Sequence, residues 1–221
     1  MSSLKDILEK RIDTPPPLFL KDELTLDQEK YLSEVYEKAF HCSILSPSHS
    51  NTQPVRFAFF EEMNRIKDLF LWLDNNYSKE FKPGKYNSLS DFHGSKVKRV
   101  FIPIYKVLDR DDEKKSNPEW ESQATASIAV NNACVSLNQS DPFITKDGKK
   151  IFPSIHWWSQ DIMLPYSLEY LYQKNILERD VKYGSLGIML GGFISEEIRE
   201  KFYFHPKHQQ KLSIKEFVLK V

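Results

Sequence analysis

SPSHSNTQPVRF, residues 46–57, is a run of small and polar residues that ends in a proline and a strand-like apolar segment. It holds two prolines, three serines, a His, an Asn, a Thr and a Gln, between a predicted amphipathic helix and a β-rich stretch. Polar segments of this kind are ordinarily surface connections. Side chains and amides at this density can also hold a ligand, so both interpretations stay open at this point.

The segment before this run has the pattern of an amphipathic helix. Thr25 followed by Gln28 is a capping-box pattern, which marks a helix start. Apolar residues then recur at helical spacing, and they are Tyr31, Leu32, Val35, Tyr36, Ala39 and Phe40. We therefore predict a helix that leads directly into residues 46–57.

Helices and strands alternate along the rest of the chain. The apolar periodicity predicts helices over 4–11, 61–76, 120–139 and 167–177. It predicts strands over 55–60, 100–108, 151–159, 183–193 and 216–221. Small residues in the 120–139 helix indicate a central position or a subunit contact.

Three further features refine this outline. Segments 77–98 and 141–150 are predicted to be insertions, the second a hairpin around Asp147-Gly148. Pro103 interrupts an almost wholly apolar strand and predicts a sheet edge or a bulge there. The glycines between 184 and 192 fit close sheet packing rather than a dinucleotide-binding turn. The order of elements predicts an α+β or α/β three-layer sandwich around one sheet, in a single domain over 1–221.

The composition is that of a soluble, cytoplasmic globular protein. Lys and Arg together number 31, as do Asp and Glu, so no net charge favours nucleic acid or an anionic membrane as a partner. No apolar run approaches the ~20 residues that span a bilayer, and the N-terminus does not resemble a secretory signal. Cys42 and Cys134 are expected to be small core residues in a reducing compartment.

Most common catalytic and metal-binding motifs are absent from the sequence. His205 and His208 have no accompanying carboxylate or Cys pattern, so no metal site is predicted. There is no GxSxG, GxxxxGK[ST] or GxGxxG motif. What remains is the 46–57 run and basic residues near both ends, and solvation or a helix dipole would explain each of these alone.

The combination resembles a known family. The stretches KRIDT (10–14), SPSHSNTQPVRF (46–57), PEWESQ (118–123) and PKHQQKLSIKEFV (206–218) are similar to motifs of the flavin (FMN)-dependent nitroreductases. The His at position 49 and the W-E-x-x-x-x-A pattern from Trp120 to Ala126 resemble the compact bacterial NAD(P)H nitroreductases in particular. The resemblance spans nearly the whole chain.

This resemblance implies an α+β fold, a nitroreductase-like three-layer α-β-α sandwich with a mixed, mostly antiparallel sheet. It implies a homodimer with FMN at the subunit interface and a terminal strand (216–221) that reaches the partner. It implies hydride transfer from NADH or NADPH through the flavin N5 to a nitroaromatic, quinone or similar acceptor. Because the isoalloxazine carries that chemistry, no catalytic side chain is expected.

The resemblance also assigns cofactor-binding residues. Arg11, beside Lys10, would meet the phosphate, with Lys211 and Lys207 completing that pocket. The loop side chains would lie along the flavin and ribityl chain, and they are Ser48, His49, Asn51 and Gln53. Two further elements match the family's phosphate-binding positions, namely Asp13 and the run Trp157, Trp158 and Ser159.

Three positions depart from the family pattern. Asp13 stands where a serine is usual, and a carboxylate repels a phosphate. Val55 replaces a tryptophan, and Trp158 replaces a phosphate-binding arginine. Asp13 and Trp158 favour an alternative, a catalytically degenerate nitroreductase-fold protein that binds flavin or another planar ligand without turnover. A structural dimer without a ligand is the third possibility.

Overall fold

Helices and strands alternate in the computed structural model, which describes residues 15–47, 53–77, 96–107, 118–158 and 163–203. The helical elements are η1 (Pro16–Leu18), α2 (Leu26–Ile44), α3 (Met63–Tyr77), α5 (Pro118–Asn138), α6 (Met163–Gln173) and α7 (Glu196–Tyr203). The strands are β1 (Val55–Phe60), β2 (Arg99–Lys106), β3 (Phe143–Ile144), β4 (Lys150–Trp158), β5 (Tyr183–Ser185) and β6 (Ile188–Ser195). The predicted helix at 4–11 and strand at 216–221 lie outside the described residues.

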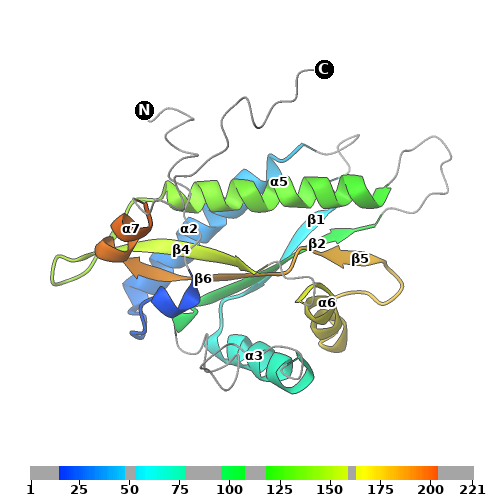
Figure 1. The fold of residues 1–221 in the computed structure, drawn as a ribbon, viewed down its shortest axis with the longest axis horizontal. Helices are drawn as coiled ribbons and strands as arrows, with labels where there is room; N and C mark the ends of the chain where they lie inside the picture. The colour runs from blue at the N-terminus through cyan, green and yellow to red at the C-terminus, as the bar shows by residue number, and fades with distance from the viewer. Residues whose placement is uncertain (1–14, 48–52, 78–95, 108–117, 159–162, 204–221) are drawn as a thin grey trace.

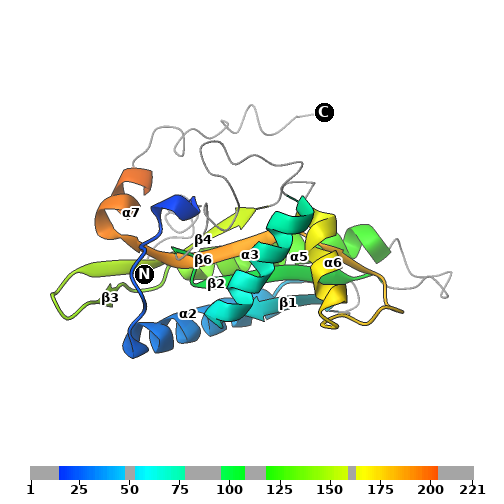
Figure 2. The same cartoon turned by 90° about the horizontal axis from the view of Figure 1, so that it is seen from below.

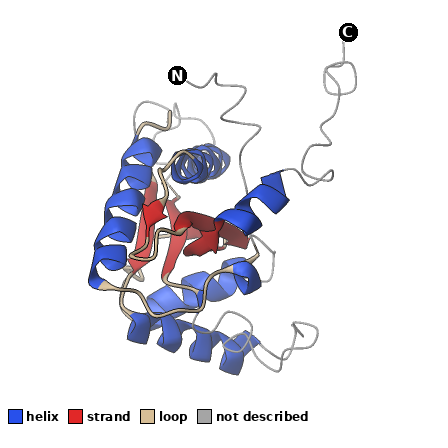
Figure 3. Cartoon of the chain, turned by 90° about the vertical axis from the view of Figure 1, so that its left-hand side faces the viewer, coloured by secondary structure: helices blue, strands red, loops and turns tan. Residues whose placement is uncertain are grey.

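The six strands form one sheet between two helical layers. Their order is β1-β2-β6-β4-β3, with β5 also paired to β2, and every pairing of the described strands is antiparallel. Helices α2 and α5 cover one face, and α3 and α6 cover the other (Figures 1 and 2). The view in Figure 3 shows the strands enclosed between these helices. The α+β three-layer prediction is confirmed.

A separate apolar core lies on each face of the sheet. The core under α2 and α5 includes Leu32, Tyr36, Phe101 and Val130. The core under α3 and α6 includes Ile66, Leu69, Ile102 and Leu171. Strand β2 supplies side chains to both cores and is buried along all but its last residue, as its apolar sequence predicts.

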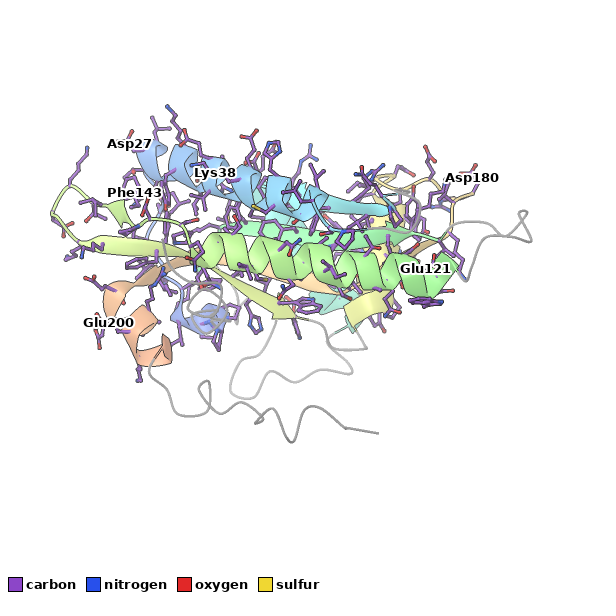
Figure 4. All side chains as sticks on the ribbon, turned by 90° about the horizontal axis from the view of Figure 1, so that it is seen from above. Asp27, Lys38, Glu121, Phe143, Asp180 and Glu200 are labelled. Carbon is purple, nitrogen blue, oxygen red and sulfur yellow. The ribbon has the colours of Figure 1, made fainter. Side chains whose placement is uncertain are left out.

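Small side chains let α2 and α5 pack closely. Ala126, Ala129 and Ala133 are buried on α5, and Ser43 of α2 donates from Oγ to the Ala129 carbonyl oxygen at 2.9 Å. The capping box is present, since the Thr25 side chain accepts from the Gln28 N–H. Figure 4 looks onto this layer, where α2 and α5 run side by side. The small residues of the 120–139 helix thus let another backbone approach closely, as predicted, and of the two expected positions only the subunit contact stays a prediction.

Pro103 lies in β2, a central strand of the sheet and not an edge strand. The interruption that this proline predicted lies in the adjacent chain segment, between β5 and β6. On one side β2 pairs first with β6 and then with β5, and these two strands are separated at Leu186-Gly187. The Pro103 carbonyl accepts from the Leu186 N–H at 3.1 Å. Because the carbonyl and the nitrogen of a strand residue point to the same side, the Pro103 nitrogen, which carries no hydrogen, also faces this interruption. The single strand predicted over 183–193 is therefore two strands, with Gly187 at φ 99° between them.

Two other predictions concern segment ends. Residues 141–150 form the predicted hairpin, since β3 pairs with β4 and Gly148 sits at φ 79° in the turn.

Helix α6 begins at Met163 rather than at 167 because a proline at position 165 is tolerated in the first helical turn. It ends at Gln173, and Asn175 (φ 55°) follows in the left-handed conformation typical of helix ends.

Candidate functional site

A cavity of about 530 Å³ lies where α2 ends and β1 begins. Ligand pockets usually measure ~300–1,000 Å³. Its walls come from α2, β1, the first half of α5 and the chain on either side of residues 48–52. The lining residues are Phe40, Ser43, Ile44, Ser46, Gln53, Val55, Arg56, Phe57, Phe59, Thr125 and Ala129. The 46–57 run therefore begins and ends at this cavity.

Helix α5 fixes the chain as it enters the polar run. The Asn132 amide donates from Nδ2 to Ser46 Oγ at 3.1 Å, and Thr125 donates from Oγ1 to the Pro47 carbonyl oxygen at 3.3 Å. Ser46 and Thr125 are both buried. Because these donors belong to a helix in the core, the entry to the loop has a defined position beside the cavity.

The exit from the polar run is also fixed, in an unusual backbone conformation. Gln53 has φ 42°, a left-handed value that costs a non-glycine residue roughly 1–2 kcal/mol. The Arg56 guanidinium donates from Nη1 to the Gln53 carbonyl oxygen at 2.9 Å and to that of Val55 at 2.7 Å. The Pro54 carbonyl accepts from the Lys106 N–H at 2.9 Å. Strained backbone held by its surroundings is typical of ligand-binding sites.

One wall of the cavity is aromatic. The Phe40 ring lies 5.2 Å, between centroids, from both Phe57 and Phe59. Among the described lining residues, Arg56 carries the only charge. An apolar aromatic wall beside hydroxyls, an amide and one cation suits a planar heteroaromatic ligand with a polar edge or an anionic group.

Of the predicted cofactor-binding residues, three lie in the described part of the chain. Gln53 lines the cavity. Trp157 and Trp158 lie in β4 and do not line it: the Trp157 indole donates to the Leu186 carbonyl oxygen at 2.8 Å, and Trp158 is 6% exposed in the core under α3 and α6. Outside the described residues lie Lys10, Arg11, Asp13, Ser48, His49, Asn51, Ser159, Lys207 and Lys211.

Several residues that border this cavity were not predicted from the sequence. Arg56 had no predicted role, although it lies within the 46–57 run, three positions after Gln53. Thr125 and Asn132 are seven residues apart, which places them on the same face of α5 two turns apart. Polar side chains at that spacing, in a helix rich in small residues, could have indicated a polar contact on that face of α5. Only the fold shows that the contact is with Ser46 and Pro47.

No group of three or more His, Cys, Asp or Glu side chains within the described residues could hold a metal ion. No helix in the described ranges is long and apolar enough to cross a membrane.

The fold is nitroreductase-like. A nitroreductase-like family protein from Bacillus cereus superposes with a TM-score of 0.67 at 14% identity, over 100% of this chain and 97% of that one. A protein from Desulfovibrio desulfuricans, whose structure holds FMN, gives a TM-score of 0.57 at 13% identity, over 100% and 98% of the two chains. An FMN-dependent nitroreductase from Clostridium difficile gives 0.52 at 16% identity, over 87% and 88%. No protein-family model and no curated protein matches the sequence.

Proposed function

We propose that the protein is an FMN-dependent oxidoreductase that takes a hydride from NADH or NADPH and passes it to a nitroaromatic, quinone or similar acceptor. The observation that carries this proposal is the cavity lined by both described ends of the 46–57 run, which the motif assigns to the flavin, within a nitroreductase-like fold. When bound, FMN would supply the hydride chemistry at its N5 atom.

The described lining fits the flavin ring. The rings of Phe40, Phe57 and Phe59 offer an apolar surface for the isoalloxazine, which is planar and aromatic. The Gln53 amide can both donate and accept at the ring's polar edge. The chain's own task is thus to bind and orient the ring, and to keep water from one of its faces.

The phosphate would be held by the basic residues that the motif assigns. Arg11 would make the main contact, beside Lys10, with Lys207 and Lys211 completing the pocket, and Ser48, His49 and Asn51 would lie along the ribityl chain. Arg56 adds a further cation, and it lines the described cavity. Charge-assisted bonds to phosphate are stronger than neutral hydrogen bonds.

We also propose that the whole chain is one domain and that two copies form a homodimer across the cavity. Large apolar side chains are exposed at the end of α2 and on α5, two elements that line the cavity, namely Ile44 (59%), Leu45 (79%), Trp120 (57%) and Ile128 (40%). Exposed apolar groups gathered in one region mark interaction sites. A second subunit placed there would cover them and close the cavity.

Trp158 supports the second candidate, a protein that binds flavin without turnover. It occupies the position of a phosphate-binding arginine in the family motif, and its indole is packed in the core. It therefore cannot supply the missing cationic contact, and Asp13 adds a carboxylate where the motif has a serine. Both features would lower affinity for the phosphate.

The visible spectrum of the purified protein tests both candidates. The enzyme is expected to show the oxidised-flavin band near ~450 nm, which NADH or NADPH bleaches under anaerobic conditions. A bound flavin that neither nicotinamide reduces would support the second candidate. Colourless protein that takes up no added FMN would refute both.

A further inference from the structure

A second cavity, of about 520 Å³, lies at the opposite end of α2. It is bordered by Leu24 and Gln28 near the start of α2, whereas the cavity described above is bordered by Ile44 at its end. Nineteen helical residues at about 1.5 Å each separate these ends. Its other walls are the β3–β4 hairpin, the end of β6 and the start of α7. Figure 4 shows Phe143 of the hairpin at the same end of the molecule as Asp27 of α2.

Lys98 lines this second cavity, although the residue is only 4% exposed. Its backbone N–H donates to the Gly191 carbonyl oxygen at 2.8 Å, which anchors it beside β6. Its Nζ donates to the Lys21 carbonyl oxygen at 3.4 Å. Lysine is almost never this deeply buried, and here the stem is enclosed while the residue still faces a space large enough for a small molecule.

The rim of the second cavity is acidic. Two of its exposed lysines are already engaged, Lys149 with Asp147 at 2.6 Å and Lys150 with Glu196 at 3.1 Å. The remaining carboxylates of the lining are Asp22, Glu23 and Glu197. The rim therefore favours a cationic ligand over an anionic one.

Two opposing effects act on the Lys98 amine. Burial lowers the pKa of its ammonium below the ordinary lysine value, while the nearby carboxylates of Asp22, Glu29 and Glu23 act to raise it. Burial is the larger effect, so a greater fraction of this amine is neutral than of an exposed lysine amine. Neutral amines of desolvated lysines are the nucleophiles that form Schiff bases with carbonyl compounds.

We propose that Lys98 is a nucleophilic amine that captures small aldehydes as an imine, and that the second cavity selects aldehydes with an apolar body and a cationic group. The carbonyl carbon would meet Nζ of Lys98. The body would pack on Leu24, Phe193 and Ile151, which line the same cavity. The cationic group would face the carboxylates of the rim. This site shares no lining residue with the proposed flavin site.

The reaction is balanced without any oxidant or reductant. The Nζ lone pair attacks the carbonyl carbon, a C–N bond forms, and the carbonyl π electrons move to oxygen. A proton moves from nitrogen to that oxygen, which gives a carbinolamine. A second proton lets the hydroxyl leave as water, and a C=N bond forms. The protonated imine is a cation, so Asp22 and Glu23 stabilise it.

Reductive trapping tests the proposal on the full-length protein. Three probes share one ring and differ in charge: 4-(trimethylammonio)benzaldehyde, benzaldehyde and 4-carboxybenzaldehyde. Each is added at pH 7 with cyanoborohydride, and mass spectrometry of peptides follows the label at Lys98, Lys149 and Lys150. We expect Lys98 to react with the cationic probe several-fold faster than Lys149 or Lys150, because those two exposed amines are held as ammonium groups in ion pairs. We expect the cationic probe to exceed the anionic one at Lys98 by about fivefold.

Two variants control for the fold and for general lysine labelling. Lys150→Met removes a rim amine and is expected to leave labelling at position 98 unchanged or faster. Lys98→Arg keeps a cation that can donate to the Lys21 carbonyl, and it is expected to lose the fast-labelled peptide while its thermal unfolding stays cooperative. Wild-type protein labelled at Lys149 and Lys150 but not at Lys98 would overturn the proposal. Equal labelling of Lys98 by cationic and anionic probes would overturn the assigned ligand class.

Discussion

The Arg56 guanidinium holds the backbone of Gln53, with Nη1 donating to the Gln53 carbonyl oxygen at 2.9 Å. Gln53 is at φ 42°, a conformation that its own side chain does not favour. The same Nη1 donates to the Val55 carbonyl oxygen at 2.7 Å, so the guanidinium bridges two carbonyls on either side of Pro54. Arg56 thereby sets the direction in which Gln53 enters the cavity.

We predict that Arg56→Ala weakens FMN binding. Without the bridge, Gln53 can relax from its left-handed conformation, and the cavity also loses a cation. We expect the dissociation constant for FMN to rise about tenfold, which corresponds to ~1.4 kcal/mol. Quenching of flavin fluorescence during titration of the apoprotein measures it. Arg65→Ala is the matched control, since Arg65 pairs with Glu62 at the start of α3 and both side chains are exposed. Equal affinity in both variants would contradict a positioning role for Arg56.

A second prediction concerns the proposed dimer. Ile128 on α5 is 40% exposed near the first cavity, and Ile176 is 44% exposed after α6. We expect Ile128→Glu to shift the protein towards monomer and to lower its flavin content, because a charge in a buried interface is costly. Ile176→Glu should change neither. Light scattering after gel filtration reports the mass, and absorbance reports the flavin. If Ile128→Glu remains a dimer, this part of α5 does not lie in the subunit interface.

A third prediction tests the close packing of β6 against α2. A Cβ built on Gly191 would lie 2.3 Å from Tyr36 Oη, and Tyr36 is wholly buried with its hydroxyl donating to the Ser154 carbonyl oxygen at 3.2 Å. Because neither group can move freely, Gly191→Ala should lower the free energy of unfolding by about 1–3 kcal/mol. Urea denaturation measures the change.

The control for Gly191 lies in the β3–β4 turn. Gly148 is at φ 79°, and a Cβ there would meet nothing within 4 Å. Asn tolerates this conformation, so Gly148→Asn should cost less than about 1 kcal/mol. If Gly191→Ala is no more destabilising than Gly148→Asn, the contact with Tyr36 is not tight.

Local patterns in the sequence predicted the layers of the fold well. The Thr25–Gln28 capping box and the apolar spacing after it predicted α2 from neighbouring residues alone, and the structure has this helix with its capping box. The apolar run of β2 predicted a strand buried on both faces. These features are decided by residues within a few positions of one another, which is why sequence alone could reveal them.

The positions of the site residues depended on contacts between distant segments. Thr125 meets Pro47 and Asn132 meets Ser46 across more than seventy positions of sequence. The motif assigned Gln53, which lines the first cavity, but it also assigned Trp158, which packs on the other face of the sheet. Successive residues of a strand point to opposite faces, so a motif matched by spacing alone does not decide which neighbour faces the ligand.

The last prediction concerns acid stability and the contact between α3 and α6. Asp68 accepts from the Tyr170 hydroxyl at 2.9 Å and pairs with Lys174 at 2.7 Å. The hydrogen bond from Lys174 is the largest cause that lowers the pKa of Asp68 below its ordinary value. A carboxyl whose folded pKa is depressed stabilises the protein above its unfolded pKa, about 3.9, and this stabilisation is lost as pH falls through the folded value.

Asp68→Asn should therefore lower the free energy of unfolding at pH 6 to 7, and the difference from wild type should shrink as the pH falls below about 4. The carboxylate is half exposed, so solvent screening keeps the effect small. Urea denaturation of both proteins between pH 3 and 7 measures it. Asp74→Asn, on the same helix, controls for the loss of one carboxylate from α3. A difference between wild type and Asp68→Asn that stays constant with pH would show that Asp68 stabilises the fold through its shape rather than its charge.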